Sequence, residues 1–168
     1  STILPSLYAH AGNCLYKLGK KRKAGQYFKK SHEIDPEDVD SYLIEGRMYM
    51  EDGDFDKAVK KWALALERAP YADTWNEIGI YSMELGQLNH ARMAFEHVKE
   101  LEPDFENINE KLASLYLLLK DKENFQKYNQ LCKRPFQLED LKKIEEMLES
   151  EDKEELAQAM KNILNALQ

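Results

Sequence analysis

Cysteine, proline and glycine are scarce in this 168-residue sequence, which holds two, five and seven of them. Cys14 and Cys132 are far apart and lie among apolar residues, so we expect buried, inert thiols rather than a disulfide framework or a zinc site. No apolar run approaches the ~18 residues that a membrane-spanning helix needs. The first residues show neither a basic start nor an apolar stretch, and a cytoplasmic location is favoured. Because the sequence does not begin with Met, we expect a segment of a longer protein or a processed form.

Signatures of catalysis are also missing. Every glycine except Gly25 belongs to a regular spacing, which leaves no phosphate-binding glycine loop, and there is no HExxH or CxxC motif. His90 and His97 share a predicted helix face but are two turns apart, roughly 10 Å by the helical rise, which is too far to hold one metal ion. The sequence therefore predicts no catalytic residues, no metal site, no cofactor and no enzyme activity.

Charge is unevenly distributed along the chain. The net charge is −7, yet residues 1–34 carry seven basic residues against Glu33, a local net of +6. The overall acidity argues against general nucleic-acid affinity. A basic run could contact nucleic acid, but it lacks interleaved aromatic residues, and a solvated helix face is the favoured interpretation. The run comprises Lys20, Lys21, Arg22, Lys23, Lys29 and Lys30.

The few glycines and prolines recur with one period. Gly12, Gly46 and Gly79 are separated by 34 and 33 residues. Four further columns keep these intervals: Gly19, Gly53 and Gly86; Ala24, Ala58 and Ala91; Phe28, Trp62 and Phe95; Pro36, Pro70 and Pro103. A period near 34 is typical of helical solenoids. Each unit is predicted to be two antiparallel helices joined by a short turn.

Each column has a physical reason. A glycine in the middle of a helix costs about 1 kcal/mol relative to alanine, so the first column indicates a neighbouring helix that packs too closely for a Cβ atom. The second glycine column suits the left-handed residue that ends a helix. The prolines end the second helix of each unit because they cannot continue it.

The order aromatic, Leu-Gly, Tyr, turn Gly, Ala, aromatic, Ala and Pro resembles the tetratricopeptide repeat. The second unit carries it as Tyr42, Gly46, Tyr49, Gly53, Ala58, Trp62, Ala65 and Pro70. The resemblance implies an all-α fold, a right-handed α-α superhelix (a TPR solenoid). The solenoid is predicted over residues 1–133, with three clear repeats at about 5–37, 38–71 and 72–104 and a degenerate fourth at 105–133. One departure is Glu45, which replaces an apolar residue and is either paired or in solvent.

Beyond Pro135 the period stops, and residues 134–168 are predicted to form a C-terminal helical hairpin cap. Two apolar stripes support it: Leu138, Leu141, Ile144 and Leu148, then Leu156, Met160, Ile163, Leu164 and Leu167. Ser150 and Asp152 between them suit the capping of the second helix. Shielding the open end of the solenoid is favoured. The alternative is a helix that docks in its own or a neighbour's groove.

The resemblance further implies that the first helices of the pairs line a concave face that binds protein or peptide. The predicted partner-binding groove consists of Asn13, Tyr16, Leu43, Ile44, Arg47, Met50, Asn76, Ile80 and Met83. We expect the five apolar residues among them to be exposed, because other side chains already fill the core positions of these helices. The predicted function is a non-catalytic scaffold that holds a peptide or partner segment. The alternative is a structural or assembly segment of a longer solenoid, with possible self-association.

Some co-chaperones of this family clamp a C-terminal carboxylate with basic and Asn side chains. Asn13 matches one clamp position, but the others fall on Ala9, Ile44, Asp73 and Glu77. Two of these are acidic and would repel a carboxylate. The sequence therefore argues against a carboxylate clamp.

Overall fold

The computed structural model describes residues 3–149, and the regular structure in this range is entirely α-helical. The helices are α1 (Leu4–Lys17), α2 (Lys21–Ile34), α3 (Val39–Glu51), α4 (Phe55–Arg68), α5 (Ala72–Glu84), α6 (Leu88–Leu101), α7 (Ile108–Leu118), α8 (Lys122–Asn129) and α9 (Leu138–Glu149). They fall into two compact units, Ser1–Thr74 and Trp75–Gln168, and each unit is described by itself. The second helix predicted for the C-terminal hairpin lies outside the described residues.

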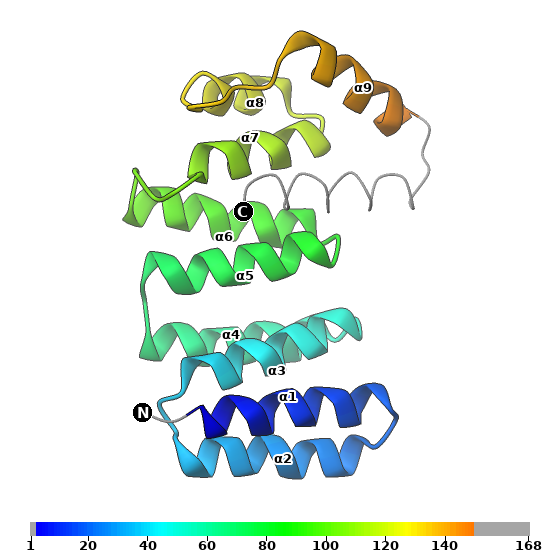
Figure 1. Ribbon diagram of the computed structural model, residues 1–168, viewed down its shortest axis with the longest axis vertical. Helices are drawn as coiled ribbons and strands as arrows, with labels where there is room; N and C mark the ends of the chain where they lie inside the picture. Colours follow the sequence, from blue (N-terminus) through cyan, green and yellow to red (C-terminus); the bar gives the residue numbers. More distant parts are fainter. Residues whose placement is uncertain (1–2, 150–168) are drawn as a thin grey trace. The chain divides into compact units, whose positions relative to one another are not determined.

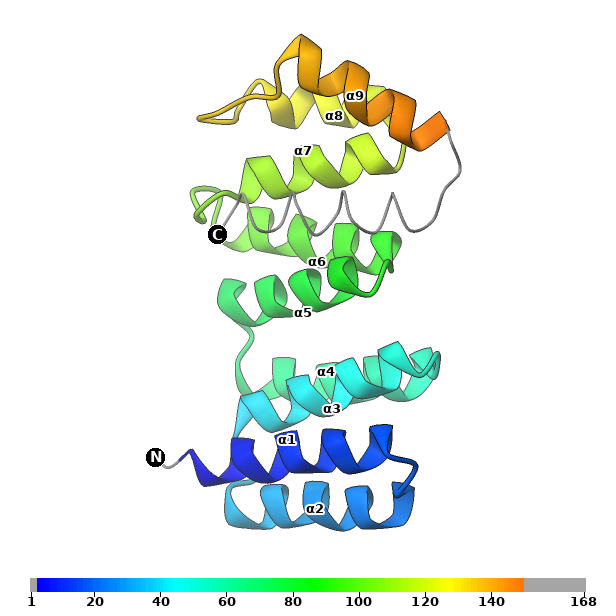
Figure 2. The same cartoon turned by 45° about the vertical axis from the view of Figure 1, so that its right-hand side comes forward.

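The first unit contains two helix pairs, as the repeat predicts. Helix α1 packs along α2, α3 packs along α4, and α1 also packs against α3. Figures 1 and 2 show α1 and α2 lying side by side in both views. In the second unit, α7 packs against both α6 and α8. The predicted all-α fold in repeated pairs is confirmed for the described residues, and the handedness of a superhelix stays a prediction.

An aromatic ring packs against the mid-helix glycine in each of the three clear pairs. The contacts are Phe28 on Gly12, Trp62 on Gly46 and Phe95 on Gly79. A Cβ atom placed on Gly46 would lie 2.3 Å from Trp62 Cδ1, closer than real Cβ atoms approach other atoms. The Trp62 indole also donates a hydrogen bond of 3.2 Å from Nε1 to the carbonyl oxygen of Leu43. The sequence interpretation of this glycine column is therefore confirmed.

The glycines at the turns between paired helices all have left-handed backbones. Gly19, Gly53 and Gly86 have φ angles of +81°, +82° and +74°. In the fourth pair, Lys120 takes the same place with φ of 59°. A side chain in this conformation costs roughly 1–2 kcal/mol. The fourth repeat therefore keeps the turn geometry of the others without the residue that suits it.

Tyrosine replaces the glycine-aromatic contact in the fourth pair. Helix α8 is only 8 residues long. Phe125, which stands where the repeat has a small alanine, is buried. The rings of Tyr116 and Tyr128 stack at 5.6 Å, and both hydroxyls donate hydrogen bonds to the carboxylate of Glu96 on α6. Burial, followed by this hydrogen bond, raises the pKa of Tyr116 to about 12. The fourth pair is thus held by a different contact from the first three.

We predict opposite effects of alanine at two glycines inside helices. Gly46→Ala should lower the free energy of unfolding by about 1–3 kcal/mol, because the added methyl group displaces the Trp62 ring. Gly25→Ala, within α2, should raise it by about 1 kcal/mol, because no atom lies within 4 Å of the added Cβ and alanine favours the helix. Urea unfolding followed by circular dichroism measures both. Equal effects at the two sites would contradict the packing argument.

A second prediction concerns the turn of the fourth pair. Lys120→Gly should raise the free energy of unfolding of this part of the chain by about 1 kcal/mol, because glycine adopts a left-handed backbone without a steric penalty. Hydrogen exchange of the α7 and α8 amides reports the change locally. Lys122→Gly, two residues later and inside α8, is the control and should lower protection instead.

Candidate protein-binding surface

The apolar residues predicted to be exposed in the groove are mostly buried. In the first unit, Leu43, Ile44 and Met50 are 3%, 7% and 2% exposed. In the second unit, Met83 is fully buried and Ile80 is half-buried. The expectation of an exposed apolar cluster was therefore wrong for four of the five residues. These four side chains contribute to the core of their units.

The burial of α3 explains the error in the first unit. Ile44 belongs to a core cluster with Ala9 of α1, Phe28 of α2 and Met48 of its own helix. Because α3 packs against the first pair and against α4, it buries residues on most of its circumference. Positions that seem surplus when one helix pair is considered alone are filled by the neighbouring pair.

The residue directly after the packing glycine is partly accessible in each clear repeat. Asn13, Arg47 and Ile80 occupy this position, and all three are half-buried. The glycine faces the aromatic ring, and the next residue points about 100° away around the helix. Asn13 Oδ1 is buried and accepts no hydrogen bond from any described residue. Three of the predicted site residues are thus brought to equivalent, partly accessible positions.

Tyr16 lies on α1 one turn before the first turn glycine and contacts the second pair. Its hydroxyl donates a hydrogen bond of 2.6 Å to Asp52 Oδ2. This bond, followed by burial, raises the pKa of Tyr16 to about 12. The ring meets Tyr49 edge-on at 6.1 Å, and Lys21 Nζ lies 5.1 Å from the ring centroid. Tyr16 is therefore a positioned, half-buried ring with its hydroxyl already engaged.

Asn76, the remaining predicted residue, is buried in the second unit. Its Oδ1 accepts a hydrogen bond of 2.8 Å from Lys111 Nζ. Burial lowers the pKa of Lys111, whose ammonium also lies over the rings of Phe95 and Phe105. Asn76 thus accepts the hydrogen bond of a buried lysine. Contrary to the sequence prediction, this buried side chain is not accessible to a binding partner.

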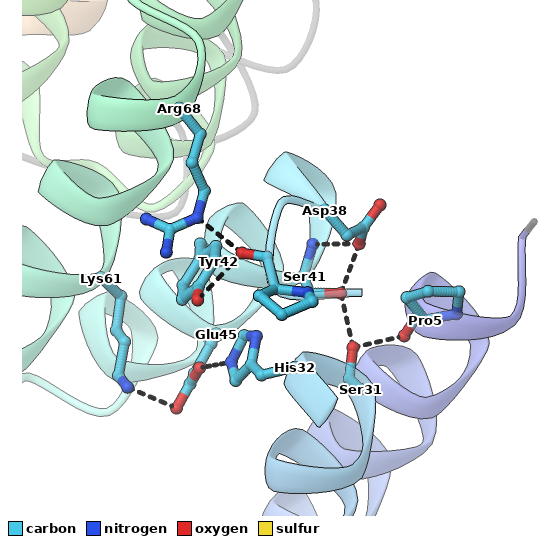
Figure 3. Close-up of polar contacts among 10 residues, drawn as sticks. Pro5, Ser31, His32, Asp38, Ser41, Tyr42, Glu45, Lys61 and Arg68 are labelled. Atoms are coloured by element: carbon cyan, nitrogen blue, oxygen red, sulfur yellow. Dashed lines mark hydrogen bonds and ion pairs between the residues drawn. The ribbon is translucent and has the colours of Figure 1, made fainter. Parts of the chain in front are cut away.

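Glu45, the departure from the repeat pattern, is buried and paired. Its carboxylate lies 2.9 Å from His32 Nε2 and 3.1 Å from Lys61 Nζ. Figure 3 shows Glu45 between these two side chains, which come from α2 and α4. His32 also stacks on the ring of Tyr42, with 4.2 Å between the ring centroids. The guanidinium of Arg68 lies over the Tyr42 ring as well, 4.5 Å from its centroid. The carboxylate therefore joins the first and second helix pairs.

A second polar contact joins the same two pairs nearby. Ser31 Oγ donates to the carbonyl oxygen of Pro5 at 2.7 Å and lies 2.6 Å from Ser41 Oγ. Ser41 also bonds Asp38, the residue that caps the start of α3 (Figure 3). Both serines are fully buried, so small hydroxyls satisfy each other where the two pairs approach closely.

A shallow cleft of about 550 Å³ opens beside the Glu45 contact on the first unit. Its lining includes Phe28, Lys29, His32, Pro36 and Lys61. The charged groups at its floor are already paired with one another, which suits a structural joint better than a ligand site. Sequence reasoning missed this cleft, and the acidic residue in an apolar column was the one signal for it.

No group of His, Cys, Asp and Glu residues within the described range could hold a metal ion. The expectation of buried thiols was wrong for Cys14, which is exposed. Cys132 is half-buried, and burial raises the pKa of its thiol to about 11.

None of the described helices combines the length and the apolar character needed to cross a membrane.

Comparison with known proteins gives partial matches. The protein CTR9 homolog of Arabidopsis thaliana is 31% identical over 102 residues, which span 60% of this chain and 9% of that protein. The structure of PilF from Pseudomonas aeruginosa matches 76% of this chain and 59% of its own, with a TM-score of 0.53 and 19% identity. A MamA mutant matches 76% of this chain and 77% of its own, with a TM-score of 0.43 and 20% identity.

Two family models match the chain, and both describe the tetratricopeptide repeat. One covers residues 5–38 and the other residues 72–105. These ranges coincide with the first and third repeats read from the glycine and proline columns. The chain therefore contains tetratricopeptide repeats over these two ranges.

Proposed function

We propose that this chain is a non-catalytic scaffold whose first unit binds a segment of a partner protein at Asn13, Tyr16 and Arg47. Proteins of the tetratricopeptide repeat family generally act as protein-interaction scaffolds, so the family supports a protein partner. The observation that carries the site is the shared position of Asn13 and Arg47, which directly follow the packing glycine and are partly accessible.

The chemistry of these residues favours a polar or mixed segment over an apolar one. Asn13 Oδ1 lacks a hydrogen-bond donor among the described residues, and a backbone N–H of an extended segment would supply one. Tyr16 adds an aromatic surface and Arg47 adds a positive charge. Helix α3, which carries Arg47, is held in place by its buried side chains Leu43, Ile44 and Met50.

Ile80 supports a separate contact point within the second unit, considered by itself. It occupies the position equivalent to Asn13 and Arg47 and is half-buried. Its apolar side chain would favour an aliphatic residue of the partner segment at that point.

The alternative function is a structural or assembly segment of a longer tetratricopeptide repeat protein. It is favoured by the comparison with the CTR9 homolog, of which this chain spans 9%. Under this alternative, the chain should associate with a second copy of itself or with further repeats. Light scattering distinguishes the two functions, because a chain that stays monomeric across a wide concentration range argues against self-assembly.

We predict that Asn13→Ala combined with Arg47→Glu weakens partner binding at least about tenfold, since a fitted hydrogen bond and a charge contact are both lost. The chain is immobilised, partners from a matched extract are identified by mass spectrometry, and the strongest is purified for calorimetric titration. Lys60→Glu, an exposed residue of α4 with the same charge change, is the control and should bind normally. Unchanged affinity of the double variant would contradict the proposed surface.

A further inference from the structure

An apolar stripe runs along the outer side of α1. It consists of Leu7, Ala11, Cys14 and Leu18, spaced by four, three and four residues, which places them on one helix face. Leu7 is 54% exposed, Leu18 is 72% exposed and Cys14 is exposed as well. We call this set the α1 stripe. It lies opposite the buried side of α1, which carries Ala9 and Gly12.

The repeat shows what such a face does elsewhere in the first unit. Adding the 34-residue period to the α1 stripe gives Ser41, Glu45, Met48 and Asp52 on α3 and its end. Each of these four contacts the preceding helix pair. Ser41 meets Ser31, Glu45 pairs with His32, Met48 packs with Ala9 and Phe28, and Asp52 accepts the hydrogen bond from Tyr16. The equivalent face of α3 is therefore covered by helices.

The α1 stripe differs from its equivalent on α3 in chemistry. Three of the four residues on α3 are polar and are matched by polar groups of α1 and α2. The α1 stripe offers only apolar carbon and sulfur atoms. A helix that covers it must therefore present an apolar stripe of its own.

The segment that follows the α1 stripe in the sequence is basic. Lys20, Arg22, Lys23 and Lys30 are exposed and have no acidic partner within the part of the chain that the structure describes. Helix α2 begins at Lys21 without a side-chain cap and without an acidic residue in its first turn. The helix dipole adds positive potential at this end. By contrast, Asp38 and Asp54 cap the starts of α3 and α4. An acidic partner would therefore be attracted to the start of α2.

We propose that the α1 stripe, together with the basic start of α2, docks an amphipathic α-helix from a partner protein. The docked helix is apolar along one face and acidic beside it. Its apolar face covers Leu7, Cys14 and Leu18, and its acidic side chains pair with Lys20 and Lys23. A helix is the fitting occupant because helices cover the equivalent face of α3.

A second copy of this chain fits the surface less well than such a partner. Residues 1–34 carry a net charge of +6, so two copies meeting through their α1 stripes would bring like charges together. The partner helix instead supplies the opposite charge. The inference rests on the proposed scaffold function but uses a face of α1 that excludes Asn13 and Tyr16, so the two proposals can fail separately.

The test uses a designed probe of about five helical turns with leucines three and four residues apart and glutamates on both flanks. A matched probe carries lysines in place of the glutamates. Fluorescence anisotropy under reducing conditions measures the binding of both labelled peptides to the full chain. We expect the acidic probe to bind at least about tenfold more tightly, and added salt to weaken it. Equal binding of the two probes, or none, overturns the proposal.

Variants locate the binding face. Leu7→Asp with Leu18→Asp should reduce affinity for the acidic probe at least about tenfold, because charges then oppose its apolar face. Leu101→Asp, at a leucine on α6 that is about as exposed as Leu7, is the control and should leave affinity unchanged. Lys20→Glu with Lys23→Glu should reverse the preference between the probes without disturbing the apolar stripe. If affinity survives both double variants, the probe binds elsewhere and the proposal is wrong.

Light scattering of the unmodified chain tests the competing occupant. We expect a monomer in the absence of the probe. A dimer that dissociates in the Leu7→Asp variant would show that a second copy covers the α1 stripe, and would overturn the assignment to a partner helix.

Discussion

The contact between a mid-helix glycine and an aromatic ring sets the spacing within each clear helix pair. At Gly46 the Trp62 ring occupies the space where a Cβ would stand, and the same arrangement recurs at Gly12 and Gly79. The ring is held at a fixed depth because the glycine leaves no room for a side chain between the two helices. This close approach aligns the pair, and the left-handed glycine at the turn then returns the chain antiparallel. The fourth pair, which lacks the contact, relies on stacked tyrosines and a shared carboxylate instead.

The same constraint decides which side chains of a first helix can reach a partner. The aromatic ring covers the helix face that carries the glycine. The next residue points about 100° away around the helix, so Asn13 and Arg47 stay partly accessible. The side that faces the preceding pair is covered in α3 and exposed in α1. A scaffold of stacked pairs thus has two kinds of surface: the row that follows the glycines, and the end face of the first helix. We propose an extended partner segment for the first surface and a partner helix for the second.

Polar residues at the joint between the first two pairs show how the stack tolerates charge in its interior. Glu45 stands where an apolar residue is usual, yet His32 and Lys61 from two different helices reach it. A buried carboxylate without such partners would be strongly destabilising. The paired arrangement makes this joint specific, because a different neighbouring pair would leave Glu45 without its hydrogen bond to His32. The buried serines beside it add a similar requirement for matched hydroxyls.

The sequence by itself determined the repeat, the helix boundaries near its glycines and prolines, and the resemblance to the tetratricopeptide repeat, because these follow from local backbone chemistry at a fixed period. It also indicated that Glu45 was unusual and that Asn13, Tyr16 and Arg47 lie on the first helices. Only the tertiary structure decided that Leu43, Ile44 and Met50 are buried, that Asn76 is engaged by Lys111, and that Leu7 and Leu18 are exposed. The physical reason is that burial depends on the neighbouring pair as well as on the residue's own helix. A periodic pattern predicts which face of a helix is apolar, while the number of faces that are covered is set by what packs around it.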